Sequence, residues 1–165
     1  MKRALVITAS DGVSAGTRQD AGGAAVGDRL ESLGFSVGRA VLPDERAQLT
    51  EVLRASAASH ELIVTTGGTG LTPRDVTPQA TQDAIDYDVP GLAEAMRAAG
   101  RVSTPFADLS RGVVGVIGRA LVINLPGSPK GALESLAAIE GVLDHALETL
   151  DGPFDHDSMT QRSAR

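Results

Sequence analysis

Short β-branched apolar runs alternate with amphipathic stretches through the first half of the chain, and this alternation restricts the fold most. The apolar runs at residues 4–9, 35–42 and 62–64 are expected to be strands. Between them, residues 21–33 and 46–58 carry leucine and valine at helical spacing. Strand and helix thus alternate with a period of about 30 residues, which predicts an α/β fold: a single-domain, doubly wound, mostly parallel sheet with helices on both faces.

The second half of the chain predicts an antiparallel edge to this sheet. Two β-rich runs, residues 112–117 and 120–125, are separated by two residues, which is hairpin spacing. A long helix with a leucine-rich stripe is expected over residues 130–150. Shorter helices are expected to end near Tyr87 and Asp88, to run from about Gly91 to Gly100, and to cover residues 107–111. Residues 1–150 are therefore expected to form one domain, followed by a flexible tail over 151–165.

The composition excludes several classes of function. With 165 residues and 42% hydrophobic side chains, the chain can form one domain with a sizeable core. A net charge of -6, one tyrosine and three phenylalanines argue against a nucleic-acid-binding surface. The absence of cysteine excludes disulfides, thiolate metal sites and thiol nucleophiles. No stretch approaches the roughly 18 apolar residues of a membrane span, and Asp11 ends the first apolar run too early for a signal peptide, so we expect a cytoplasmic protein.

The stretch from residue 61 to residue 81 has the composition of a phosphate site. Its apolar start leads into a glycine loop, residues 67–70, whose three glycines can adopt positive φ and bring backbone N–H groups against a bulky anion. A helix is expected to follow, with the Thr77 hydroxyl as its N-cap and Pro78 at its first position. Phosphate binds readily at such a helix N-terminus. The alternative is a tight strand-to-helix turn in which the glycines only permit the geometry.

The predicted topology brings other polar residues to the same place. In a parallel sheet, ligands bind at the carboxyl ends of the strands, where the following loops meet. Asp44 and Asp75 follow the second and third predicted strands at equivalent junctions, so we expect them to face one another across a site. The segment 126–130 repeats the pattern of the glycine loop, because a strand ends, a glycine turns, Ser128 caps a helix and Pro129 takes its first position.

These motifs resemble those of one known family. Residues 66–70 (Thr-Gly-Gly-Thr-Gly), 74–78 (Arg-Asp-Val-Thr-Pro) and 126–130 (Pro-Gly-Ser-Pro-Lys) are similar to the molybdopterin-binding family of molybdenum cofactor biosynthesis. Within it, the chain resembles the stand-alone molybdopterin adenylyltransferases of the MogA/MoaB group and the G domain of gephyrin, over about residues 2–150. The resemblance implies a homotrimer in which ATP, with Mg²⁺, adenylylates the terminal phosphate of molybdopterin. Pyrophosphate leaves, and a molybdenum insertase is the implied recipient of the product.

The resemblance also implies roles for individual residues. Asp44 and Asp75 are expected to be catalytic and to bind Mg²⁺, since this ion is usually held by one or two carboxylates plus substrate phosphates. The residues expected to bind phosphate or nucleotide are Ser10, Ser14, Asp20, Gly67, Gly68, Thr69 and Gly70. The residues expected to bind molybdopterin are Thr77, Glu94, Pro126, Gly127, Ser128 and Lys130.

Each of these roles has a simpler alternative. Asp44 can be a loop or capping residue, and Asp75 can be an ion-pair partner of Arg74. Asp20 can serve only as the N-cap of the first helix, and Lys130 can be a solvated side chain.

Two other functions stay open beside the transferase. One is a relative that binds or carries molybdopterin without turnover, which would need no pair of magnesium carboxylates. The other is a nucleotide pyrophosphate hydrolase on the same fold. Retention of both Asp44 and Asp75 favours the transferase, although Gln79 stands where the family motif usually has an acidic residue. A flavodoxin-like electron carrier is disfavoured, because the loops lack aromatic side chains to enclose a flavin.

Overall fold

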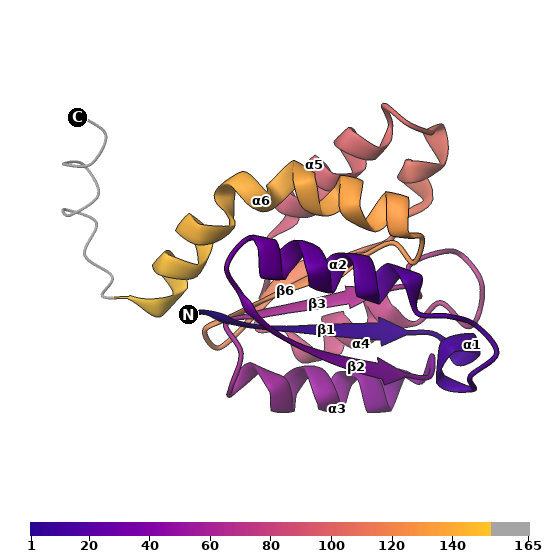
Figure 1. The fold of residues 1–165 in the computed structure, drawn as a ribbon, viewed down its shortest axis with the longest axis horizontal. Coiled ribbons are helices and arrows are strands. Elements are labelled where there is room, and N and C mark those ends of the chain that lie inside the picture. The colour runs from indigo at the N-terminus through magenta and orange to yellow at the C-terminus, as the bar shows by residue number, and fades with distance from the viewer. Residues whose placement is uncertain (153–165) are drawn as a thin grey trace.

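Six strands form one sheet in the order β2-β1-β3-β6-β5-β4 in a computed structural model, which describes residues 1–152 (Figure 1). Four neighbouring strands are parallel, and β5 and β4 extend the sheet in antiparallel pairing. The predicted parallel sheet with an antiparallel edge is thus confirmed. The strands are β1 (Arg3–Ala9), β2 (Ser36–Leu42), β3 (Leu62–Thr66), β4 (Tyr87–Asp88), β5 (Val114–Ile117) and β6 (Ala120–Leu125).

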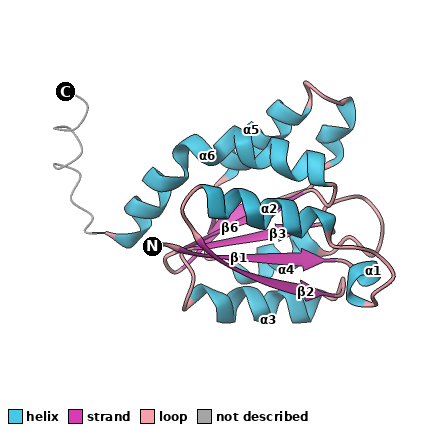
Figure 2. Cartoon of the chain, viewed as in Figure 1, coloured by secondary structure: helices cyan, strands magenta, loops and turns pink. Residues whose placement is uncertain are grey.

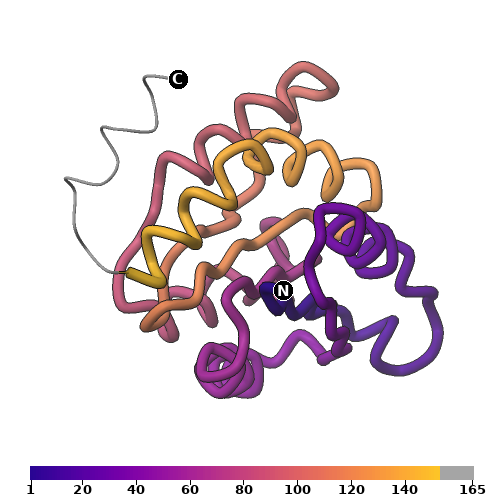
Figure 3. The backbone as a smooth tube through the Cα atoms, turned by 60° about the vertical axis from the view of Figure 1, so that its left-hand side comes forward, coloured from indigo at the N-terminus to yellow at the C-terminus, as the bar shows by residue number. Residues whose placement is uncertain are grey.

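Helices cover both faces of the sheet, as the alternating pattern predicts (Figure 2). Successive side chains of a strand point to opposite faces, so each central strand contributes to two cores. In β3, Leu62 and Val64 pack in one core, and Ile63 packs in the other. The first core lies under α2 (Ala21–Ser32), α5 (Pro90–Gly100) and α6 (Pro129–Asp151), and the second lies under α3 (Arg46–Ala57) and α4 (Thr77–Ala84). Helices α5 and α6 lie side by side (Figure 3).

The ends of two long helices follow the capping signals of the sequence. The side chain of Asp20 accepts a hydrogen bond from the N–H of Gly23 at the start of α2. The side chain of Ser128 accepts one from the N–H of Gly131 at the start of α6, where Pro129 is the first residue. Both predicted caps are confirmed, and they lie at the same edge of the sheet.

Three local predictions are wrong. Residues 10–20 are not entirely a loop, because Ser10 caps a short helix, α1 (Asp11–Ser14). Tyr87 and Asp88 do not end a helix but form strand β4, since the flanking backbone N–H groups bond to carbonyls of β5. The helical piece expected over 107–111 is a 3₁₀ helix, η1 (Pro105–Leu109), which starts two residues earlier at a proline.

The remaining expectations concern the C-terminal end and membranes. Helix α6 continues to Asp151, one residue beyond its predicted end. The predicted flexible tail lies almost wholly outside the described residues. No helix within residues 1–152 is both long and apolar enough to cross a membrane.

Candidate functional site

Four loops meet at the carboxyl ends of the parallel strands β1, β2, β3 and β6. They comprise residues 10–20, 43–45, 67–76 and 126–128, which follow these strands directly. Because the strands are parallel, their ends share one edge of the sheet, and the loops line two adjoining cavities there. The topology thus brings together residues separated by more than a hundred positions in the chain.

The first of these, the polar cavity, has a volume of about 480 Å³ and contains most of the predicted phosphate site. Asp20, Asp44 and Asp75 contribute carboxylates to its wall. Arg18 is the one cationic side chain that lines it within residues 1–152, and it forms no ion pair with another described residue. The other predicted residues that line it are Ser10, Gly67, Gly68, Thr69, Gly70, Gly127 and Ser128.

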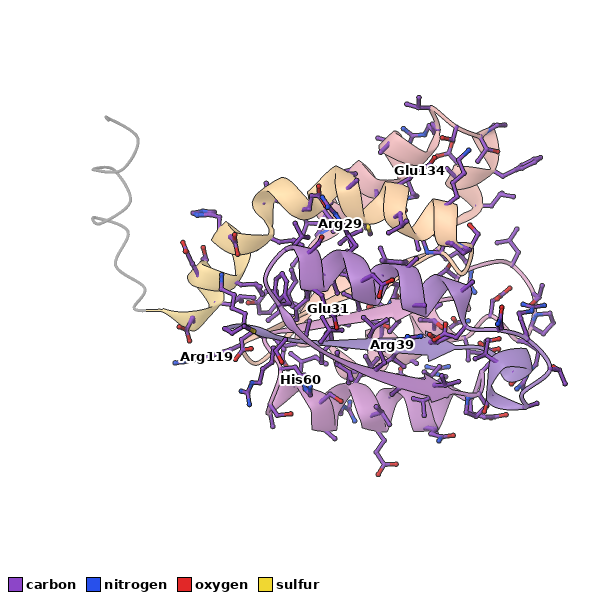
Figure 4. The ribbon with its side chains drawn as sticks, in the orientation of Figure 1. Arg29, Glu31, Arg39, His60, Arg119 and Glu134 are labelled. Atoms are coloured by element: carbon purple, nitrogen blue, oxygen red, sulfur yellow. The ribbon has the colours of Figure 1, made fainter. Side chains whose placement is uncertain are left out.

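The second, the apolar cavity, has a volume of about 280 Å³ and lies between α5, η1 and the start of α6. Its wall includes Met96, Phe106 and Leu109, together with the predicted residue Pro126. Glu134, labelled in Figure 4, borders it from α6. The two cavities share Thr69, Gly70 and Ser128, so a ligand with an apolar part and a phosphate can extend from one cavity into the other.

At the floor of the polar cavity, main-chain segments from different loops lie in close contact. Gly67 and Gly68 have φ values of 89° and 66°, which side chains strongly disfavour. A Cβ on Gly67 would lie 2.5 Å from the carbonyl oxygen of Ala9. Similarly, a Cβ on Gly22 would lie 2.6 Å from the carbonyl oxygen of Gly127. Only glycine fits at Gly67 and Gly22. The N–H of Gly67 donates to the carbonyl of Leu125 (3.1 Å), so the N–H groups without a partner among residues 1–152 are those of residues 68–70.

Only one of the two carboxylate oxygens of Asp44 has a hydrogen-bond partner among residues 1–152. Its Oδ2 accepts a hydrogen bond from the N–H of Asp11 (2.9 Å), and Asp11 accepts one from the N–H of Asp44 in return (3.0 Å). Its Oδ1 is buried and has no hydrogen-bond partner among residues 1–152. Burial raises the pKa of Asp44, and the nearby carboxylates of Asp11 and Asp75 act in the same direction. A buried carboxylate oxygen without a partner is costly, and a bound cation would remove this cost.

Asp75 is not paired with its neighbour Arg74, so that alternative is wrong. Its Oδ2 accepts a hydrogen bond from the N–H of Thr72 (2.9 Å). Arg74 instead reaches across to Asp11, with contacts of 2.9 and 3.0 Å, and to Glu45, at 3.1 Å. The hydrogen bond from Arg74 holds the pKa of Asp11 below its usual value. Since Arg74 neutralises other carboxylates, Asp44 and Asp75 stay available to a cation in the polar cavity.

The hydrogen bonds of Asp20 show that it has a structural role beside any contact with ligand. Its Oδ1 accepts from the Thr8 hydroxyl (2.8 Å) and from the N–H of Gly23 (2.9 Å). Its Oδ2 accepts from Arg39 (2.6 Å), which is labelled on β2 in Figure 4. Burial opposes ionisation of Asp20, but these hydrogen bonds outweigh it and hold the pKa of the carboxyl below its usual value. The capping role considered for Asp20 is therefore confirmed.

Asp20→Ala is expected to lower the free energy of unfolding at pH 7 by about 1 kcal/mol, from loss of the N-cap alone. Because the folded state lowers the pKa of Asp20, its contribution is present above the unfolded value of about 3.9 and is lost as the pH falls through the folded value. Urea denaturation of both proteins at pH 7 and in the acid range measures this difference. Asp28→Ala is the control, since Asp28 is exposed on the same helix and its side chain has no hydrogen bond to a described residue. A difference that persists unchanged into acid would contradict the assignment.

Four predicted residues do not line either cavity. Ser14 is exposed at the end of α1, and Glu94 is exposed on α5, where Ala93, Met96 and Gly100 form the buried face. Lys130 is exposed on α6, and its Nζ lies 3.8 Å from Oε1 of Glu134.

Thr77, the fourth of these residues, is buried, and its predicted capping role is wrong. It is the first residue of α4, Val76 is the N-cap, and no side chain caps this helix. The helix starts one residue earlier than expected because the carbonyl of Val76 accepts the first helical hydrogen bond, from the N–H of Ala80 (2.9 Å). The N–H of Thr77 donates to the carbonyl of Gly68 (3.1 Å). The Thr77 hydroxyl is buried without a partner among residues 1–152.

Three residues of the site were not predicted from the sequence: Asp11, Arg18 and Arg111. The only local signal for the first two was their position in a polar, glycine-containing loop after a strand. Arg111 had no such signal, because it lies just before β5 and all of its partners come from distant segments.

Comparisons with known proteins find similarity to molybdopterin-related proteins over nearly the whole chain. Residues 5–145 match the family described as "probable molybdopterin binding domain". The chain is 36% identical to the molybdopterin adenylyltransferase of Escherichia coli K12, over 90% of this chain and 85% of that protein. It is 39% identical to the molybdenum cofactor biosynthesis bifunctional protein of Synechococcus elongatus, over 93% of this chain, and it spans about half (48%) of the length of that relative. The crystal structure of the molybdopterin biosynthesis enzyme MoaB from Thermus thermophilus superposes with a TM-score of 0.86 at 48% identity, over 94% of this chain and 100% of that chain.

Proposed function

The chain belongs to the family of probable molybdopterin-binding domains, and we propose that it transfers an adenylyl group from MgATP to the terminal phosphate of molybdopterin. A phosphate oxygen of molybdopterin forms a bond to the α-phosphorus of ATP, and the bond from this phosphorus to the bridging oxygen breaks, so that pyrophosphate leaves. The relative named molybdopterin adenylyltransferase supports this proposal. The observation that carries it is the buried, unpartnered oxygen of Asp44, in the same cavity as Asp75.

The donor set of the polar cavity fits a magnesium ion that is bound together with substrate. Residues 1–152 contain no group of three or more His, Cys, Asp or Glu side chains that could hold a metal by themselves. Asp44 and Asp75 supply two carboxylates, and Mg²⁺ is usually held by one or two carboxylates plus substrate phosphates. When bound, the ion would neutralise charge on the phosphates of ATP.

The other parts of the site fit the two substrates. The N–H groups of residues 68–70 in the glycine loop would bind phosphate oxygens in the polar cavity, and the N-terminus of α6 at Ser128 would bind another. The apolar cavity would take the pterin, because its walls are largely apolar with a few polar groups. Thr69, Gly70 and Ser128 lie at the junction, which is where the terminal phosphate of molybdopterin would meet the α-phosphate of ATP. Such transfers depend mainly on this positioning and on charge stabilisation.

Arg18→Gln is expected to raise the KM for ATP about tenfold, because one charge-assisted hydrogen bond to phosphate contributes about 1.5 kcal/mol or more. Arg18 is suited to this role since it lines the polar cavity and has no ion-pair partner among the described residues. Steady-state kinetics with varied ATP measures the effect, with turnover at saturating ATP changing much less. Arg119→Gln is the matched control: Arg119 is an exposed arginine in the β5–β6 hairpin, at the opposite edge of the sheet (Figure 4). Equal KM values for ATP in Arg18→Gln and the wild type would exclude this role.

The decisive experiment is anaerobic incubation of the protein with molybdopterin and MgATP, with measurement of pyrophosphate and adenylylated pterin. Formation of both in equal amounts is the expected result. Tight pterin binding without pyrophosphate would contradict the transferase and indicate a carrier. Cleavage of a dinucleotide, with no effect of pterin, would contradict it in favour of a pyrophosphate hydrolase.

The proposed function extends to assembly and location. We propose a homotrimer that works in the cytoplasm and transfers its product to a molybdenum insertase, as the family resemblance implies. The named relatives in molybdenum cofactor biosynthesis support the pathway but do not bear on the number of subunits. Sedimentation equilibrium of the purified protein measures that number.

A further inference from the structure

Arg111 makes four hydrogen bonds to the glycine loop and the residues that follow it, and it does not line the polar cavity. Its backbone N–H donates to the carbonyl of Thr69 (2.9 Å), and its Nε donates to the carbonyl of Gly70 (2.8 Å). Its Nη2 donates to the carbonyl of Asp75 (2.7 Å), and its Nη1 contacts the side chain of Gln79 (3.3 Å). One half-buried side chain therefore fixes both ends of the segment 70–75 and joins it to helix α4.

These contacts fix the main chain of Gly70 and of Asp75, the residue that carries the carboxylate. The carboxylate packs over Gly70, because a Cβ at that position would lie 2.9 Å from Asp75 Oδ2. The side chain of Arg111 donates to the main-chain oxygens of Gly70 and Asp75 and not to any carboxylate of the described residues. An ion pair between Arg111 and Asp75 would compete with a bound cation, whereas hydrogen bonds to the carbonyl groups leave the carboxylate free.

The position of Arg111 is fixed in turn by Arg97, a residue of the apolar cavity. Arg97 on α5 lines that cavity, and its Nη1 donates to the carbonyls of Gly112 (3.0 Å) and Ser110 (3.4 Å), the two neighbours of Arg111. The segment 110–112 is thus held between two guanidinium groups, one toward the apolar cavity and one toward the glycine loop.

We propose that Arg111 is the positioning residue that orients the carboxylate of Asp75 for the divalent cation, an inference that rests on the proposed function. A planar guanidinium can satisfy three acceptors in fixed directions, and an ammonium group at the end of a flexible stem cannot. Residues that orient the ligands of a metal typically affect metal affinity by about 10- to 100-fold when they are changed.

The test compares Arg111→Met and Arg111→Lys with the wild type. Both variants are expected to weaken binding of Mn²⁺ in the presence of ATP about tenfold or more, measured by electron paramagnetic resonance without pterin. The Mg²⁺ concentration needed for half-maximal turnover should rise by a similar factor, and pterin affinity should stay within about twofold. Arg29→Met is the matched control, because Arg29 makes two hydrogen bonds to Glu140 between α2 and α6 (Figure 4).

The outcomes separate this inference from the proposed function. Folded Arg111 variants with wild-type Mn²⁺ affinity and Mg²⁺ dependence would overturn the inference alone. If both variants fail to fold, the inference is also overturned, because Arg111 would then serve the fold as a whole. A wild-type protein that binds Mn²⁺ with ATP but releases no pyrophosphate would overturn the proposed function, and the Mn²⁺ measurement would still decide the role of Arg111.

Discussion

Asp75→Asn is expected to reduce adenylyl transfer about a thousandfold or more while leaving molybdopterin binding nearly intact. The amide has the shape of the carboxylate and can still accept the hydrogen bond from the Thr72 N–H, so the loop should keep its conformation. It lacks the negative charge that attracts the divalent cation. Pyrophosphate release measures the loss of turnover, and quenching of pterin fluorescence measures binding. Loss of pterin binding in this variant would contradict the assignment of Asp75 to the metal.

Two companion variants make this result specific to the site. Asp44→Asn should lose turnover as well, yet it should unfold at no lower temperature than the wild type. The reason is that burial and the neighbouring carboxylates raise the pKa of Asp44, so ionisation of this carboxyl is less favourable in the folded than in the unfolded protein without metal. Asp144→Asn should behave like the wild type, because Asp144 is an exposed carboxylate that pairs with Lys2, far from the cavities.

Gly67→Ala is expected to lower the free energy of unfolding by about 3 kcal/mol or more and to abolish turnover. Two independent effects contribute. The residue has a φ of 89°, which is unfavourable for alanine, and its new Cβ would lie 2.5 Å from the carbonyl oxygen of Ala9. The atom that the new Cβ would meet belongs to the main chain, so no side-chain rotation relieves this clash. Urea denaturation measures the change in stability.

The control for this variant is a glycine without either constraint. Gly141 lies within α6, and a Cβ there would meet nothing within 4 Å. Gly141→Ala is therefore expected to raise the free energy of unfolding by about 0.5–1 kcal/mol, because alanine restricts the unfolded chain and favours the helix. If Gly67→Ala unfolded with wild-type stability, the loop would have to be free to move away from Ala9, and the glycine loop proposed to bind phosphate would lack a fixed geometry.

Local patterns in the sequence were sufficient to predict most of the fold. The alternation of apolar runs and helical stretches predicted the parallel strands, because both periods can be read within a few residues. The topology then predicted that Asp44 and Asp75 share a cavity, since parallel strands place their carboxyl ends at one edge.

Residues whose role depends on distant partners were not predictable in this way. Arg111 donates to a carbonyl 41 positions away, and Arg74 pairs with an aspartate 63 positions away. Nothing in the neighbouring sequence indicates such partners. Glu94 illustrates the reverse case, because a family position placed it near the pterin and the packing of α5 leaves it exposed.

The close backbone contacts at Gly22 and Gly67 limit how this protein can evolve. A substitution at either position would bring a side chain against main-chain atoms, and no compensating change of a neighbouring side chain can move those atoms away. Substitutions are therefore not expected to accumulate at these two positions. The rim of the apolar cavity has exposed side chains such as Phe106 and Leu109, and substitutions can accumulate there. Divergence toward a different pterin or nucleotide should consequently accumulate at the rim, while the phosphate-binding floor stays the same among descendants of this chain.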